Sequence, residues 1–257
     1  MNYFVLLKMV PDTVEELEIA ADGKSLDKDV IRLKVADSDD HALEQALLLK
    51  DKHGGNVTVV ALEAPEVDDV LFTALAKGAS RAVKIAGDWG DLQSCAAAQV
   101  IAKFLAPDGK LPADAVVMLR SQSIDDLEGE VGNYLADLMG APYIGIVTSA
   151  AAEGNNLNVV KEFAGGLRGE FSVPLPAVLG IQSAEKPPRY VPIAKVRAVQ
   201  KTAKIETVDV GAPESMAAYA VEKMYKPEAA GRAEMFEGSP EEIADKIVDV
   251  LAKNSLI

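Results

Sequence analysis

The chain has 257 residues, of which 49% are hydrophobic, and its 40 acidic and 26 basic residues give a formal net charge of −14 at pH 7. This length and apolar content are sufficient for one large or two smaller folded domains. The acidic excess argues against nonspecific nucleic-acid binding, because such binding depends on Lys and Arg neutralising phosphates.

The sequence shows no membrane or secretion signal. No apolar run approaches the ~18 residues that span a bilayer, and the first residues lack a basic start and a small-residue cleavage site. The single cysteine, Cys95, excludes an internal disulfide and is compatible with a reducing compartment. We therefore expect a cytoplasmic protein without direct membrane insertion.

Apolar runs alternate with helical periods over roughly the first 150 residues. Strands are expected at residues 3–10, 56–62, 81–87 and 114–120, and helices at residues 39–54, 64–79, 92–106 and 130–140. A small hairpin with its turn at Asp22 and Gly23 is expected between the first strand and the first helix. This order predicts an α/β fold, a three-layer, mostly parallel sheet with helices on both faces.

The pattern changes after Gly140. Residues 143–163 are typical of a hairpin with its turn at residues 154–156, and residues 169–182 of further strands broken by prolines. Residues 186–204 contain six basic and no acidic residues, and we expect the stretch 184–204 to be a loop.

The last fifty residues or so are expected to form an extended arm that ends in a helix. Ser239, Pro240 and Glu242 form a capping-box pattern at the start of that helix. Its apolar face, which contains Ile247, needs a partner, either its own domain or another chain. We therefore predict an α/β domain at residues 1–205 and a C-terminal arm and docking helix at residues 206–257.

The turn at residues 123–132 poses a question about ligands. It follows the expected fourth strand and precedes a helix, which is a common place for an anion site. However, it carries four carboxylates, Asp125, Asp126, Glu128 and Glu130, which suit the helix dipole but repel a phosphate. The residues alone leave open whether this turn and the loops after the other strands bind a nucleotide or are ordinary solvated loops.

The sequence lacks the common signatures of independent catalysis. It contains no Walker loop, no G-x-S-x-G elbow and no G-x-G-x-x-G after the first strand. The two histidines, His41 and His53, fall in one expected helix without a second ligand cluster at metal-binding spacing. We therefore predict no catalytic residue and no metal site.

Five stretches in the same order resemble the beta subunit of electron transfer flavoproteins, over nearly the whole chain. They are VLLKMVPDT, DDHALEQALLLKDKHGGNVTVVAL with LFTALAKGASRAVKI, SQSIDDLEGEVG, VVKEFAGGLRGEFSVPLPAVLG and KPPRYVPIAKVRAVQK. The C-terminal MYKPEAAGRAEMFEGSPEE further resembles a branch of the family that includes methylotroph forms. The order of these motifs, more than any one of them, identifies the chain as a member of this family.

The resemblance implies a Rossmann-like, adenine-nucleotide-hydrolase-like fold and an electron carrier without catalysis of its own. An alpha subunit would bind one FAD that is shared with this chain. The pair would carry electrons from a primary flavin dehydrogenase to a quinone oxidoreductase or another acceptor. The alternatives are a beta subunit of an electron-bifurcating assembly with a second FAD, and a stand-alone adenine-nucleotide-binding module.

The resemblance also implies site residues. The candidate adenylate (AMP) pocket consists of Leu6, Lys8, Asp39, Glu63, Gln122, Ser123, Ile124, Asp125, Gly129, Val131 and Gly132, and the candidate flavin or alpha-subunit side consists of Arg189 and Tyr190. Glu63, Glu128 and Glu130 replace neutral or small residues of relatives, which favours an altered pocket, with retained AMP as the close alternative. Glu185 lies near the position where some relatives present a leucine to dehydrogenases, so that mode of docking is not expected.

Overall fold

The computed structural model describes residues 1–27, 29–90, 92–214, 219–227, 231 and 233–257. The chain divides into two compact units, Met1–Glu222 and Lys223–Ile257. Residues 215–218, 228–230 and 232 of the predicted arm lie outside the described residues.

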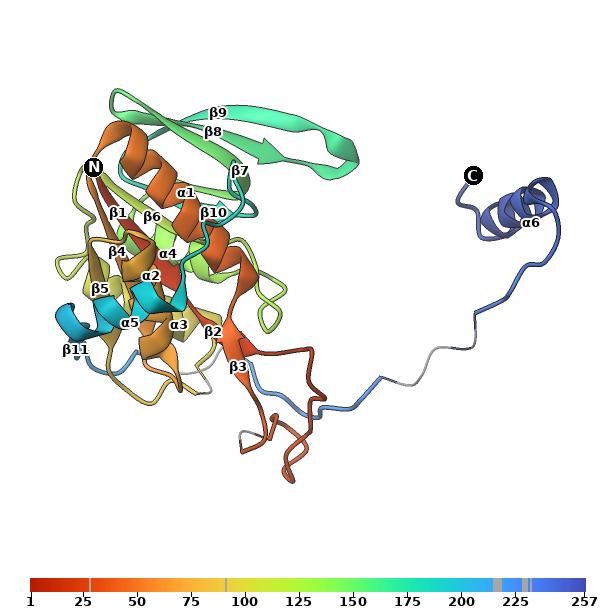
Figure 1. Ribbon diagram of the computed structural model, residues 1–257, viewed down its shortest axis with the longest axis horizontal. Helices are drawn as coiled ribbons and strands as arrows, with labels where there is room; N and C mark the ends of the chain where they lie inside the picture. Colours follow the sequence, from red (N-terminus) through yellow and green to blue (C-terminus); the bar gives the residue numbers. More distant parts are fainter. Residues whose placement is uncertain (28, 91, 215–218, 228–230, 232) are drawn as a thin grey trace. The chain divides into compact units, whose positions relative to one another are not determined.

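Within the described residues, the main sheet has nine strands in the order β11-β5-β4-β1-β6-β10-β7-β8-β9 (Figure 1). Seven of its strands run parallel, and they are β1 (Asn2–Leu7), β4 (Asn56–Leu62), β5 (Arg81–Ile85), β6 (Ala115–Arg120), β7 (Tyr143–Glu153), β10 (Ala177–Ile181) and β11 (Glu206–Val208). At its centre, Val5 of β1 pairs with Val59 of β4 on one side and with Met118 of β6 on the other. Every residue of β6 is buried, as expected for a central parallel strand covered on both faces.

Helices cover both faces of this sheet. The helices of the α/β unit are α1 (Asp37–His53), α2 (Val67–Lys77), α3 (Ser94–Leu105), α4 (Val131–Met139) and α5 (Ile193–Thr202). Leu43 and Leu47 of α1 and Leu71 of α2 pack in one apolar cluster, whereas Val100 of α3 and Leu135 of α4 pack in another. The predicted three-layer α/β architecture is therefore confirmed.

The predicted hairpins are also present. β7 (Tyr143–Glu153) and β8 (Asn156–Glu162) pair antiparallel around Gly154, and β9 (Arg168–Pro174) pairs antiparallel with β8. Figure 1 shows β8 and β9 side by side at the end of the sheet. Near the N-terminus, β2 (Met9–Pro11) pairs with β3 (Leu33–Val35), and a bridge between Ile19 and Leu26 encloses the turn at residues 22–23.

The expectation that residues 184–204 form a loop is wrong, because residues 193–202 form helix α5. Val196 and Val199 of α5 are partly buried, α5 packs beside α2, and the Gln200 side chain donates to the Asp69 carboxylate at 3.1 Å. The helical signal is weak in the sequence because Pro192 is the N-cap and the segment carries no acidic residue in the first turn.

The chain after residue 205 stays on the α/β unit for a further stretch. β11 pairs with β5 at the edge of the sheet. Beyond it, Lys103 donates to the Ala212 carbonyl at 2.7 Å, and the Gln93 amide donates to the Tyr219 carbonyl at 2.6 Å. These contacts fix the described residues up to Tyr219 along α3.

The C-terminal unit contains helix α6 (Pro240–Lys253). The predicted capping box is confirmed: the Glu242 N–H donates to Ser239 Oγ, and the Ser239 N–H donates to the Glu242 carboxylate. No helix in the described part of the chain is long and apolar enough to cross a membrane.

Candidate functional site

The candidate site lies at the carboxyl ends of β1 and β6. The chain proceeds from β1 to β4 and β5 on one side, and then returns across the sheet to β6 on the other side. The helices α1 and α2 cover one face, and α3 and α4 cover the opposite face. This reversal is a topological switch point, where doubly wound sheets open a ligand crevice.

Asp39, in the first turn of α1, joins the ends of β1 and β6. Its carboxylate accepts the Lys8 N–H at 2.7 Å and the Arg120 N–H at 3.1 Å, and it pairs with the Arg120 guanidinium at 3.3 Å. Asp39 is fully buried and the Arg120 side chain is 8% exposed. Burial raises the pKa of Asp39 above its ordinary value, although the Arg120 charge and the two N–H donors oppose that shift.

A second ion pair joins the same two strand ends. The Lys8 ammonium contacts the Asp125 carboxylate at 2.7 Å, and the Ser123 hydroxyl donates to the same carboxylate at 2.7 Å. Burial by itself would raise the pKa of Asp125, but the Lys8 charge and the hydrogen bonds from Lys8 and Ser123 lower it overall. Lys8 and Asp125 thus link the loop after β1 to the turn after β6.

The Lys8–Asp125 ion pair is expected to make the free energy of unfolding depend on pH in the acid range. Because the pKa of Asp125 is lowered in the folded state, its contribution is fully present above the ordinary value of 3.8 and is lost as the pH falls through the folded pKa. We expect Asp125→Asn to lower the free energy of unfolding by about 1 kcal/mol at pH 7. Urea unfolding of both proteins at several pH values would show the difference disappearing at strongly acid pH. A difference that persists there would contradict the ion-pair explanation.

The turn after β6 is shaped by its own hydrogen bonds. Ser123 and Asp126 exchange both backbone hydrogen bonds, at 3.0 and 3.1 Å, and the Asp126 carboxylate accepts the Gly129 N–H at 3.2 Å. Gly129 has a φ of +66°, and a Cβ atom there would lie 2.1 Å from the Ser121 carbonyl oxygen. Only glycine therefore fits at this position.

The variant Gly129→Ala tests whether the turn after β6 requires glycine at this position. Strain at positive φ and the overlap with the Ser121 carbonyl are expected to cost at least about 2 kcal/mol of unfolding free energy. The matched control is Gly154→Ala in the β7–β8 turn, where φ is +60° and a Cβ would meet nothing within 4 Å. Thermal unfolding should show a clearly larger loss for Gly129→Ala, and equal losses would contradict the steric account.

The first turn of α4 follows the acidic turn. The N–H groups of Val131, Gly132 and Asn133 have no acceptor among the described residues, and the side chain of the N-cap residue, Glu130, does not cap the helix. Burial first, and then the charges of Glu128, Asp126 and Glu130, raise the pKa of Tyr219. The carboxylates of this turn therefore disfavour the ionised form of the Tyr219 hydroxyl.

Other residues predicted for the adenylate pocket have different surroundings. Leu6 is 3% exposed and packs in the core, Ile124 is exposed, and the Gln122 carbonyl accepts the Ser38 hydroxyl at 3.2 Å. The Glu63 carboxylate accepts the Gly87 N–H at 3.0 Å, beside the end of β5. The structure thus brings Lys8, Asp39, Ser123 and Asp125 together and directs Leu6 and Glu63 elsewhere.

Arg189 and Tyr190, predicted for the flavin side, differ in exposure. The Arg189 guanidinium pairs with Glu44 at 2.9 Å and with Asp51 at 3.0 Å, and these hydrogen bonds raise its pKa. Tyr190 is 85% exposed. Arg189 therefore anchors this segment to α1, while Tyr190 presents its ring to solvent.

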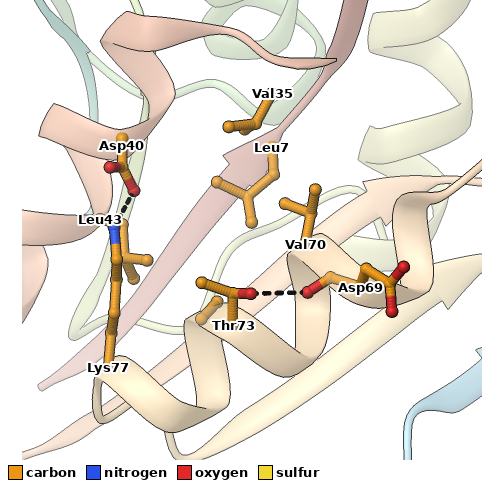
Figure 2. A pocket seen from close by; sticks show the side chains of 9 residues that line it. Leu7, Val35, Asp40, Leu43, Asp69, Val70, Thr73 and Lys77 are labelled. Atoms are coloured by element: carbon orange, nitrogen blue, oxygen red, sulfur yellow. Dashed lines mark hydrogen bonds and ion pairs between the residues drawn. The ribbon is translucent and has the colours of Figure 1, made fainter. Parts of the chain in front are cut away.

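A pocket of about 250 Å³ lies between α1 and α2, apart from these residues (Figure 2). Leu7, Leu43 and Val70 form apolar walls. Asp40 and Lys77 pair with each other, as Figure 2 shows. Its walls include none of the residues predicted for adenylate binding, so the strand ends at the switch point remain the candidate site. No group of three or more His, Cys, Asp or Glu side chains that could hold a metal occurs in the described part of the chain.

Two residues at the site were not predicted from the sequence. Arg120 ends an apolar strand, and its partner Asp39 is 81 positions away. Tyr143 fills the space that side chains at Gly132, Gly145 and Gly180 would need. For Arg120, the one available signal in the sequence is an arginine at the end of a fully apolar run. For Tyr143, the sequence offers no signal.

Comparison with known proteins agrees with this architecture. Residues 27–213 match the family model described as the electron transfer flavoprotein domain. A beta subunit of electron transfer flavoprotein from Methylophilus methylotrophus is 33% identical over 267 residues, which cover 98% of each chain. The chain belongs to the electron transfer flavoprotein beta-subunit family.

Two further beta subunits of this family support the assignment. The protein from Clostridium acetobutylicum is 32% identical over 211 residues, covering 81% of this chain and 79% of the relative. The protein from Bacillus subtilis is 26% identical over 263 residues, covering 100% of both. The family resemblance expected from the sequence motifs is therefore confirmed.

Proposed function

We propose that this chain pairs with an alpha subunit, that the pair shares one FAD, and that it carries electrons from primary flavin dehydrogenases to a quinone oxidoreductase or another acceptor. The match to the Methylophilus beta subunit over 98% of both chains is the observation that supports this most strongly. We also propose a cytoplasmic location and a role as an electron carrier without catalysis of its own.

Helix α6 has the surface that a partner subunit requires. It has no buried residue, and Ile247, Val248 and Val250 are 46%, 51% and 39% exposed. A capped helix with an unpartnered apolar face is typical of segments that dock in a groove of another chain. The alpha subunit is the partner that fits the family.

The segment from Lys186 to Lys204 suits an aromatic, anionic group and an acidic partner surface. Tyr190 and Ile193 are 85% and 67% exposed. Within this segment, the cations that form no ion pair among the described residues are Lys186, Lys195, Arg197, Lys201 and Lys204. A flavin supplies one-electron and two-electron redox chemistry when bound. This chain's cations would attract its negative charge and steer acidic partners.

Co-purification tests the proposed function. The tagged chain is expressed alone and together with its alpha subunit, and each preparation is examined by gel filtration and absorbance. We expect a 1:1 complex with a flavin spectrum and no flavin on the chain alone. A chain that remains a monomer without flavin in the presence of alpha subunits would contradict the proposal and favour a stand-alone nucleotide-binding module.

A further inference from the structure

The pocket between α1 and α2 takes no part in the candidate site at the strand ends. Its volume is about 250 Å³, and Leu7, Leu43 and Val70 form apolar walls (Figure 2). Because a cavity of roughly 150 Å³ with apolar walls admits benzene, this pocket has room for a leucine or phenylalanine side chain.

The polar side chains of the pocket walls already have partners within the chain. Asp40 and Lys77 pair with each other, and the Lys77 side chain is only 9% exposed. The Thr73 hydroxyl donates to the Asp69 carbonyl at 2.8 Å, and the Asp69 carboxylate accepts the Gln200 amide at 3.1 Å. The pocket therefore suits an apolar group better than a phosphate or a sugar, which would need free hydrogen-bonding groups.

Helix α5 adds apolar surface beside this pocket. Gln200 of α5 bonds to Asp69, which belongs to the pocket wall, and Val196 of α5 is partly buried. Ile193, Val196 and Gln200 follow the i, i+3, i+7 spacing of one helix face. The side chain of Ile193, which is 67% exposed, therefore lies on the face of α5 that is turned toward the pocket.

The same helix carries exposed positive charge. Lys195, Arg197 and Lys201 are exposed and form no ion pair among the described residues. The chain as a whole has a net charge of −14, whereas residues 186–204 contain six basic and no acidic residues. This basic surface attracts an acidic protein surface, and a small molecule that filled only the pocket would not use it.

We propose that the pocket between α1 and α2 receives one apolar side chain of an electron-donating protein partner, and that the cations of α5 pair with acidic residues around that side chain. The partner supplies the apolar anchor, and this chain supplies the socket. An apolar anchor in a desolvated pocket, surrounded by a polar rim, is the arrangement that carries most of the binding energy in protein interfaces. The electron-donating role of the partner rests on the proposed function.

Methyl NMR with two acidic peptides tests the proposal on the chain alone and in complex with its alpha subunit. One nonapeptide has a central leucine between glutamates, and the other has alanine in its place. The leucine peptide is expected to shift the methyl signals of Leu7, Leu43 and Val70, and to bind at least ~10-fold more tightly than the alanine peptide. Added NaCl should weaken the binding of both peptides and leave their ratio unchanged.

The variant Thr73→Phe fills the pocket from α2 and should abolish the preference for the leucine peptide. The matched control is Thr202→Phe, which adds the same ring at an exposed position on the side of α5 opposite Gln200 and should retain the preference. Circular dichroism measures the folding of both variants. If Thr73→Phe is unfolded, the comparison of the two peptides on the wild type still decides.

Equal binding of the two peptides, no binding of either, or shifts confined to methyl groups away from the pocket would overturn the proposal. Loss of the pocket shifts in the complex would also overturn it, because the alpha subunit would then cover the pocket. FAD content and complex formation are measured separately. A flavin-containing complex without the leucine preference therefore refutes only the socket, and a chain that forms no such complex refutes only the proposed function.

Discussion

Asp39→Ala is expected to destabilise the chain by about 3–5 kcal/mol, because it leaves the Arg120 guanidinium buried without a counter-charge. Asp39 is fully buried, and its carboxylate also accepts the Lys8 and Arg120 N–H groups. Alanine would leave those donors unsatisfied as well. Urea unfolding followed by circular dichroism measures the loss.

Two further variants separate the ion pair from helix effects. Asp37→Ala changes an acid in the same first turn of α1 whose side chain is 86% exposed, and it should cost less than about 1 kcal/mol. Asp39→Leu with Arg120→Met removes both charges and should retain much more stability than Asp39→Ala. If Asp39→Ala and Asp37→Ala were equally stable, the buried pair would have no structural role.

Ile247→Asp is expected to weaken binding of the alpha subunit at least ~100-fold, which corresponds to roughly 2.8 kcal/mol. Ile247 lies on the apolar face of α6 and is 46% exposed. A carboxylate there would have to be buried without a partner when the helix docks. Surface plasmon resonance with immobilised alpha subunit measures the dissociation constant.

Asp249→Ala is the control on the opposite side of α6. It removes an exposed acid, so binding should change less than ~3-fold. The unfolding of the α/β unit should be the same in both variants, because Ile247 is on the separate C-terminal unit. Equal affinities for the two variants would show that α6 does not carry the interface.

Much of the fold could be predicted because apolar periodicity reports directly on burial. The run at residues 115–120 is apolar until Arg120, and every residue of that strand is buried. The start of α6 could also be predicted, because the capping box at Ser239 is formed by residues that are close together in the sequence. Helix α5 was missed because its packing against α2 rests on only a few apolar positions such as Val196 and Val199, among many charges.

The residues that meet at the candidate site could be predicted from the sequence, but their ion pairs could not. Motif order brought Lys8, Asp39 and Asp125 to one place, and the structure agrees that they lie together. Glu128 and Glu130, the acids that stand out in the sequence of this turn, are exposed and partly buried respectively. The charge pair at the centre, Asp39 with Arg120, joins residues from different strands and helices and depends on tertiary structure.

The FAD content of the purified complex tests the central claim most directly. Flavin is released with acid from the complex of this chain with its alpha subunit, and it is quantified against the protein concentration. The proposed function predicts one FAD for each pair of subunits. A complex without FAD would contradict the electron-carrier function, and two FAD for each pair would contradict the single shared flavin and indicate an electron-bifurcating assembly.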